Sequence, residues 1–258
     1  MGQAVCPETV RLFGMQISRV SMTQAVDTLL TWCASPRDGA CKFVVTPNVD
    51  HAVMFQERAD FRAAYENASL VLADGLPLVI SARAFGRNIP ERVAGSDVVP
   101  AVFAAATQPL RVFLLGAAPG VADEAASRIH AQWPNVRVVG TLSPPLGFDV
   151  DPVENARTLA AINAVEHDLL LVGLGAPRQE IWVNKHYREL PSKVAICGGA
   201  TIDFLAGHRQ RSPVWMRRCG LEWLHRVGSE PKRLARRYAR DACVFPRLLW
   251  REWRHATS

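Results

Sequence analysis

The sequence lacks the usual marks of a secreted, membrane-spanning or metal-binding protein. None of its apolar runs reaches the ~18 residues that a helix needs to cross a bilayer, and its N-terminus has no signal-peptide pattern. The six cysteines form no C-x-x-C pair, and the seven histidines show no metal-ligand spacing. We therefore expect a cytoplasmic protein, soluble or attached to the membrane surface, whose thiols are reduced and mostly buried.

Nucleotide-binding fingerprints are missing as well. Neither G-x-G-x-x-G nor the P-loop pattern occurs, which argues against a dinucleotide-dependent epimerase or dehydrogenase and against a standard ATP site. Apolar residues make up 49% of the chain, which is enough for a substantial core. From a length of 258 residues we expect one α/β domain of about 200 residues and an appendage.

Charge is distributed unevenly along the chain. Residues 1–208 carry seventeen Lys and Arg against twenty Asp and Glu, whereas residues 209–258 carry thirteen against four, together with four Trp. Such a basic tail favours a polyanionic partner, which could be a nucleic acid, an anionic membrane surface or a diphosphate. Trp among Arg is typical of a membrane interface. We predict an α/β domain over residues 1–208 and a basic helical appendage over residues 209–258.

Short apolar runs alternate with amphipathic segments. A hairpin is expected over residues 11–20, followed by a helix that begins at Ser21 or Thr23. The expected strands are 43–46, 70–73, 111–116, 136–140, 169–173 and 194–197. The expected helices are 54–66, 76–85, 97–106, 122–132, 155–166 and 179–187. This alternation predicts a doubly wound, mostly parallel, Rossmann-like sheet with helices on both faces.

Polar residues and glycines gather where the expected strands end, and ligands of doubly wound sheets bind at that edge. Glycine turns that lead into helices offer backbone N–H groups to phosphate. Alternatively, the glycines only close tight turns. Because several such turns share one edge, we predict a nucleotide site there. Its candidate residues are Thr46, Asn48, Asp74, Gly116, Gly173, Gly175, Gln179, Gly198 and Gly199.

Two of these side chains suit chemistry on a hydroxyl group. Asp74 follows an apolar strand, so its carboxylate is placed to act as a general base in a partly dry cleft. The alternative is that Asp74 caps the helix that begins near Leu76. Thr46 could hydrogen-bond a substrate hydroxyl, or it could be an ordinary residue at the end of a strand.

Two others suit a charged or polar ligand. Arg92 precedes a helix that we expect Ser96 to cap, and a guanidinium there can clamp a diphosphate. The alternative is a salt bridge to Glu91 or Asp97. Gln179 could orient a sugar or a base, or cap the first turn of its own helix.

The segment Asp149-Val150-Asp151 matches the D-x-D pattern that holds a metal in one large class of glycosyltransferases. It lies in a proline-rich loop, where Asp151 can simply cap the next helix. We favour the capping role and expect no metal site.

Six stretches, taken in order, resemble the WecG/TagA/CpsF family of bacterial glycosyltransferases (glycosyltransferase family 26). They are TPN at 46–48, VLADG at 71–75, ERVAGSD at 91–97, GLGAPRQE at 173–180, GGA at 198–200, and the run from RSP at 211–213 through LEWLHR at 221–226 to EPKRL at 230–234. The resemblance extends from about residue 10 to residue 238, and the role of the residues after Tyr238 is left open by it.

The resemblance implies transfer of a sugar from a UDP-sugar to a polyprenyl-diphosphate-linked sugar, in surface-polysaccharide or exopolysaccharide assembly at the inner face of the cytoplasmic membrane. It implies inversion at the anomeric carbon without a metal or other cofactor. Asp74 matches the family's proposed general base, and Thr46, Arg92 and Gln179 match pocket residues. The appendage arginines that it assigns to the diphosphate are Arg226, Arg233 and Arg236.

The main alternative is a nucleic-acid-binding protein that uses the basic tail against phosphate. The body contains no nucleic-acid module, so we expect the partners to be a UDP-sugar, the lipid-linked acceptor and an anionic membrane, not a nucleic acid. The resemblance does not select among N-acetylmannosamine, its uronic acid and glucose as the donor sugar. It also leaves open whether the protein forms a homo-oligomer away from the membrane.

Overall fold

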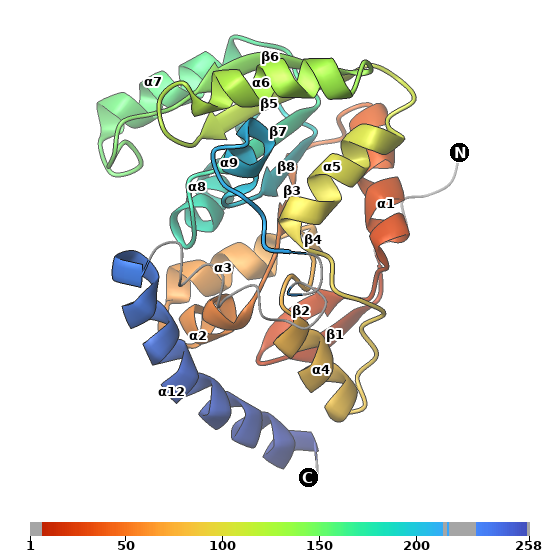
Figure 1. The fold of residues 1–258 in the computed structure, drawn as a ribbon, viewed down its shortest axis with the longest axis vertical. Coiled ribbons are helices and arrows are strands. Elements are labelled where there is room, and N and C mark those ends of the chain that lie inside the picture. The colour runs from red at the N-terminus through yellow and green to blue at the C-terminus, as the bar shows by residue number, and fades with distance from the viewer. Residues whose placement is uncertain (1–6, 214–215, 217–230, 257–258) are drawn as a thin grey trace.

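A six-stranded, all-parallel sheet forms the centre of the protein. The computed structural model describes residues 7–213, 216 and 231–256 (Figure 1). The strands lie in the order β4-β3-β8-β7-β5-β6. Their bounds are β3 Lys42–Val45, β4 Leu70–Val71, β5 Leu110–Gly116, β6 Val136–Leu142, β7 Leu169–Gly173 and β8 Val194–Cys197. The predicted doubly wound α/β fold is confirmed.

Helices cover both faces of the sheet. One face is covered by α1 (Met22–Ala34), α5 (Gly95–Ala105), α6 (Val121–Gln132) and α9 (Thr201–Ala206). The other is covered by α2 (Val49–Glu57), α3 (Ala59–Asn67), α7 (Pro152–Asn163) and α8 (Arg178–His186), and α4 (Leu76–Ala84) joins the same core. Successive strand residues point to opposite faces, so Leu169 and Leu171 enter one core while Leu170 and Val172 enter the other. Burial on both faces explains the uninterrupted apolar runs of the strands.

The predicted N-terminal hairpin and the helix after it are both present. Strands β1 (Thr9–Leu12) and β2 (Met15–Ser18) pair antiparallel. The turn between them has positive φ at Phe13 (51°) and Gly14 (86°), as a two-residue hairpin turn requires. Helix α1 then begins with a capping box, in which the Ser21 side chain accepts from the Gln24 N–H and the Gln24 side chain accepts from the Ser21 N–H.

The predicted helix over residues 54–66 is wrong as a single element. It is two helices, and the first begins at Val49, because the Asn48 side chain caps it by accepting from the His51 N–H at 3.2 Å. Arg58 separates them in an extended conformation (φ −122°, ψ 119°), and its N–H closes α2 on the Met54 carbonyl. The break turns the chain so that α3 can pack beside α2.

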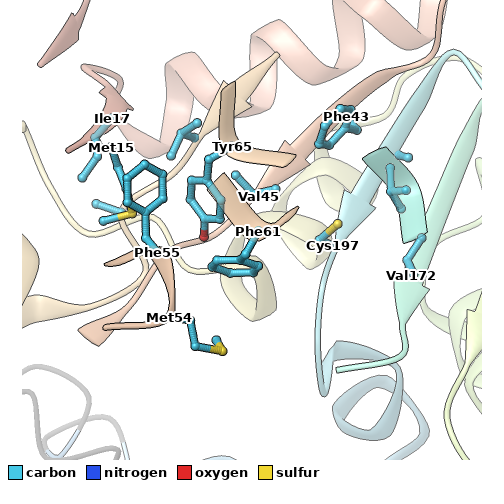
Figure 2. Close-up of a cluster of buried hydrophobic side chains, with 14 of the residues drawn as sticks. Met15, Ile17, Phe43, Val45, Met54, Phe55, Phe61, Tyr65, Val172 and Cys197 are labelled. Carbon is cyan, nitrogen blue, oxygen red and sulfur yellow. The ribbon is translucent and has the colours of Figure 1, made fainter. Parts of the chain in front are cut away.

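Aromatic side chains on α2 and α3 form part of the hydrophobic core on their face of the sheet. Figure 2 shows Phe55, Phe61 and Tyr65 close together, with Met15 and Ile17 of β2 beside them. The Phe61 and Tyr65 ring centroids are 5.0 Å apart, and those of Phe55 and Tyr65 are 5.7 Å apart. Such offset and edge-on pairs hold rings in fixed positions. The hairpin and the two helices therefore share one packed unit.

The described part of the C-terminal tail is one long helix, α12 (Pro231–Ala256), that lies along α2 (Figure 1). Leu248 is buried against the body, and the Phe245 ring lies 5.4 Å from that of Phe13. Glu252 accepts from the Phe13 N–H at 3.0 Å and pairs with Arg87. The division of the chain after residue 208 stays a prediction. None of the helices described is both long enough and apolar enough to cross a membrane.

Candidate functional site

A cavity of about 720 Å³ lies at the carboxyl ends of the central strands. Side chains from the start of α4 and from α12 complete its wall. Nine of the residues predicted from the sequence line it: Thr46, Asn48, Asp74, Arg92, Gly173, Gly175, Gln179, Gly198 and Gly199. Residues that are up to 153 positions apart along the chain are thus brought into one wall, as the parallel sheet predicts.

Asp74 and Arg92 face each other on the cavity wall. The Arg92 Nη1 lies 3.4 Å from Asp74 Oδ1, and about a quarter of the Asp74 side chain is exposed. The capping alternative for Asp74 is wrong, because α4 begins after Gly75 without any side-chain cap. Instead the Asp74 N–H donates to the Pro47 carbonyl at 2.9 Å, which fixes the backbone at this turn. The carboxylate thus borders the cavity, and its role as a general base stays a prediction.

Arg92 is itself held by Asp97 on α5. The Arg92 Nη2 lies 2.6 Å from one oxygen of Asp97, and the Arg211 Nη2 lies 2.6 Å from the other. Arg211 also donates to the Ser96 Oγ at 3.0 Å. The expected cap at Ser96 is therefore wrong, since α5 begins at Gly95 and Ser96 is turned to a guanidinium. The salt bridge between Arg92 and Asp97, which was one of the alternatives for Arg92, is confirmed. The sequence did not indicate that Asp97 also binds Arg211.

The strand-end glycines divide into two kinds. A Cβ at Gly116 would lie 2.6 Å from the Gly173 carbonyl oxygen, and one at Gly198 would lie 2.7 Å from Leu171. These two glycines allow close packing, and Gly116 itself is not on the cavity wall, where Ala117 and Ala118 follow it. Gly175 and Gly199 have positive φ (79° and 56°) and open space where a Cβ would stand. Their backbones therefore border the cavity.

Gln179 connects the two glycine loops and is nearly fully buried, with 2% exposed. Its Oε1 accepts from the Gly175 N–H at 3.2 Å and from the Gly199 N–H at 3.1 Å. Its Nε2 donates to Glu180 Oε1 at 2.7 Å. The side chain is thus a brace between loops that follow different strands, a role that the sequence could not indicate because Gly199 is twenty residues away.

Thr46 and Asn48 shape the same wall from the loop after β3. Thr46 is buried, and its Oγ1 donates to the Cys197 carbonyl at a long 3.5 Å. Its hydroxyl also lies 3.4 Å from the point where a Cβ on Gly95 would stand. Asn48 caps α2, so its side-chain oxygen is already engaged by the His51 N–H. The hydrogen bond of Thr46 is therefore the longer of the two, and the Thr46 hydroxyl can more easily exchange it for a hydrogen bond to a ligand.

The appendage arginines are only partly described. Arg226 lies outside the described residues, and Arg233 lies in α12 without a described side chain. Arg236 is exposed, and from that turn of the helix it is Arg237 that lines the cavity. Arg237 and Arg240 both pair with the buried Asp50 of α2, and the Arg240 Nη2 lies 2.8 Å from Asp50. No pattern in the sequence singled out Asp50, which occupies the first turn of α2.

Three buried titratable groups lie at the cavity: His51 and Asp241 line its wall, and Glu180 lies behind it. Burial raises the pKa of Glu180 to about 7, and burial together with nearby Asp50 raises the pKa of Asp241 to about 6. Burial lowers the pKa of His51 to about 3, so this ring is neutral, and its Nδ1 lies 2.7 Å from the Tyr65 hydroxyl. At neutral pH Glu180 is therefore only partly ionised, whereas Asp241 remains mostly ionised.

The D-x-D segment lies outside the cavity wall. Asp151 caps α7 by accepting from the N–H groups of Val153 (2.8 Å) and Glu154 (3.2 Å), as expected. Asp149 lies 3.9 Å from Arg178. Within the described ranges, no three His, Cys, Asp or Glu side chains are grouped as metal ligands.

Sequence comparison with known proteins identifies the family of this chain. Residues 10–258 match the glycosyl transferase WecG/TagA/CpsF family. An N-acetylglucosaminyldiphosphoundecaprenol N-acetyl-beta-D-mannosaminyltransferase of Bacillus spizizenii is 30% identical over 216 residues, which are 83% of this chain and 81% of the relative. The protein of the same name from Bacillus subtilis is 28% identical over 217 residues, 84% and 82% of the two chains. The chain therefore belongs to the WecG/TagA/CpsF family of glycosyltransferases.

Proposed function

We propose that this glycosyltransferase moves a sugar from a UDP-sugar to a polyprenyl-diphosphate-linked sugar. The observation that carries the proposal is the Asp74 carboxylate beside the Arg92 guanidinium in a cavity bordered by two glycine loops. The two Bacillus relatives, whose names specify a diphosphoundecaprenol-linked N-acetylglucosamine acceptor, support the acceptor class. The product would enter bacterial surface-polysaccharide or exopolysaccharide assembly.

In the proposed reaction, Asp74 removes the proton from the acceptor hydroxyl as its oxygen attacks the anomeric carbon. The bond to UDP breaks on the opposite side, so a single displacement inverts the configuration. Backbone N–H groups of the two glycine loops other than those of Gly175 and Gly199, which Gln179 engages, bind the donor diphosphate. Arg92 stabilises the charge that develops on departing UDP, and the arginines of residues 209–258 add to it, without a metal. Thr46 orients the reacting hydroxyl.

The first experiment is UDP release with a panel of UDP-sugars in EDTA, with and without a short polyprenyl-diphosphate-linked N-acetylglucosamine. UDP-N-acetylmannosamine is the first donor to test, because both relatives are named for that sugar. Acceptor-dependent release with one donor is the expected result. Release that requires an added divalent metal would contradict the metal-independent mechanism, and no release with any donor would contradict the donor class.

Asp74→Asn tests the proposed base. The amide keeps the size of the side chain but cannot take the proton, so we expect kcat to fall about 10²–10⁴-fold while the protein stays folded. Asp203→Asn is the matched control, since Asp203 is a second carboxylate on the same cavity wall and should keep most of the activity. An active Asp74→Asn enzyme, or a larger loss in the control, would remove Asp74 from the role of base.

We further propose that residues 209–258 attach the protein to the inner face of the cytoplasmic membrane. The outer face of α12 carries Trp250 and Trp253, which are 57% and 55% exposed. Exposed arginines alternate with them along the same face; they are Arg247, Arg251 and Arg254. Trp rings settle among lipid headgroups, and each arginine near anionic lipid contributes about 1 kcal/mol. The same helix lines the cavity through Arg237 and Phe245, so attachment there would bring the cavity close to the lipid-linked acceptor.

A further inference from the structure

A buried carboxyl group lies directly behind the cavity wall. Glu180 on α8 is 0% exposed, yet the proposed reaction gives it no task. Its Oε1 accepts from the Gln179 Nε2 at 2.7 Å, and its Oε2 has no hydrogen-bond partner among the described residues. Burying a carboxyl group with one oxygen unpaired costs free energy. Such a group at the edge of a functional cavity calls for an explanation beyond packing.

The Gln179 amide explains why an acceptor is needed at this position. Its oxygen receives two backbone N–H groups, from Gly175 and Gly199. If the amide turned over, its NH₂ group would face those two donors and all three bonds would be lost. Glu180 Oε1 accepts from the NH₂ group and so holds the amide in the orientation that joins both loops. The carboxyl oxygen, the amide and the two loop N–H groups form one continuous set of hydrogen bonds.

We propose that Glu180 is a positioning residue for the donor nucleotide: by fixing the Gln179 amide, it holds the Gly175 and Gly199 loops at the separation that binds the diphosphate. This rests on the proposed function for the identity of the ligand. The brace itself does not depend on the ligand, because it consists of hydrogen bonds within the chain. One loop leads from β7 into α8 and the other from β8 into α9, and no other described side chain accepts from both glycines.

The proposal separates two substitutions of similar size. Glu180→Gln keeps a carbonyl oxygen that can accept from Gln179, whereas Glu180→Met fills the same space with only a weakly accepting sulfur. Loss of one buried hydrogen bond that orders a binding loop corresponds to about a tenfold change in affinity. We expect Glu180→Met to bind UDP about tenfold more weakly than the native chain, and Glu180→Gln to bind it nearly as well.

Amide hydrogen exchange supplies a measurement that needs no ligand. In Glu180→Met the N–H groups of Gly175 and Gly199 should exchange faster, while those of the sheet are unchanged. Because Glu180 acts through Gln179, a chain with both Gln179→Met and Glu180→Met should bind UDP no more weakly than Gln179→Met alone. A purely structural role for Glu180 would instead lower the melting temperature and would give additive losses.

Each outcome decides the matter. Unchanged UDP affinity and unchanged exchange in Glu180→Met would overturn the proposal, as would additive losses in the double variant. Gln179→Met removes the same bond from the other side, so unchanged UDP affinity there overturns it even if Glu180→Met fails to fold. If the native chain binds no UDP, the proposed donor is wrong, and faster exchange at the two glycines in Glu180→Met would still support the brace.

Discussion

At the scale of single residues, the least expected features are carboxyl groups that the fold buries. Asp50 is buried and carries two arginine partners, whereas Glu180 has only an amide. The paired carboxylate is compensated by charge, and the other responds to burial by a raised pKa. Asp241 lies between these cases, since Arg240 contacts it at 3.3 Å but the raised pKa persists. Burial and pairing therefore act on each carboxyl group separately.

The raised pKa of Glu180 makes stability depend on pH. The folded protein binds this proton more tightly than the unfolded chain, so the contribution is fully present below the unfolded pKa of 4.5 and is lost as the pH rises through about 7. Asp50 on α2 and Arg237 on α12 act on the group in opposite directions. Glu180→Gln removes the titration, so its melting temperature should gain on the native one between pH 5 and pH 8. The same difference in melting temperature between variant and native chain at pH 5 and at pH 8 would contradict the raised pKa.

At the scale of elements, α12 uses its two faces differently. Leu248 and Phe245 belong to the face that packs on the body, and Glu252 extends this contact to the hairpin turn. Trp250 and Trp253 belong to the face that the body leaves exposed. Because i, i+3 and i+4 residues share a helix face, one face of α12 can pack on the body while the other stays exposed to solvent. The position of α12 thus depends on a small apolar contact and a few ion pairs.

Leu248→Ala should loosen α12 without unfolding the sheet. Truncating a buried leucine costs about 2–5 kcal/mol, and here the loss falls on the contact between α12 and the body. Trypsin should then cut within residues 236–254 faster, since arginines are frequent in this helix. Trp250→Ala is the matched control, because its side chain is exposed and its cleavage rate should equal that of the native chain. Equal rates for both variants would show that Leu248 does not anchor the helix.

At the scale of the whole molecule, the excess of positive charge and the exposed Trp side chains are concentrated in residues 209–258, whereas residues 1–208 are mildly acidic. The tail carries a net excess of basic residues, and its described part ends beside the hairpin and α4 (Figure 1). The cavity is lined both by the strand ends and by the same helix. A membrane contact through α12 would therefore act on the part of the molecule that also holds the substrates. Water exclusion from the cavity would follow from the same contact.

Binding to vesicles tests this arrangement in the full-length chain. We expect binding to anionic vesicles that weakens with salt, and that falls about tenfold or more when Trp250→Ala and Trp253→Ala are combined. Arg137→Glu on β6, at the opposite edge of the sheet, is the control and should bind as the native chain does. Sedimentation with vesicles at two salt concentrations measures the effect. Unchanged binding by the double variant would place the membrane contact elsewhere.

The sequence predicted most of the elements, because strand and helix patterns are local. It failed at Arg58, where one helical pattern is interrupted by a single extended residue. It also failed at Ser96, whose capping pattern is outweighed by the guanidinium of Arg211, 115 residues away. At Ser96 a local preference competes with a tertiary contact that the sequence does not display.

By itself the sequence determined the doubly wound fold, the family and the residues at the strand ends, because apolar periodicity and short motifs are encoded within neighbouring residues. Only the tertiary structure decided how those residues work together. It joined Arg92 to Arg211 through Asp97, made Gln179 a brace between two loops, and set Asp50 against α12. These contacts link distant segments, so they arise only when the sheet has brought the strand ends to one edge.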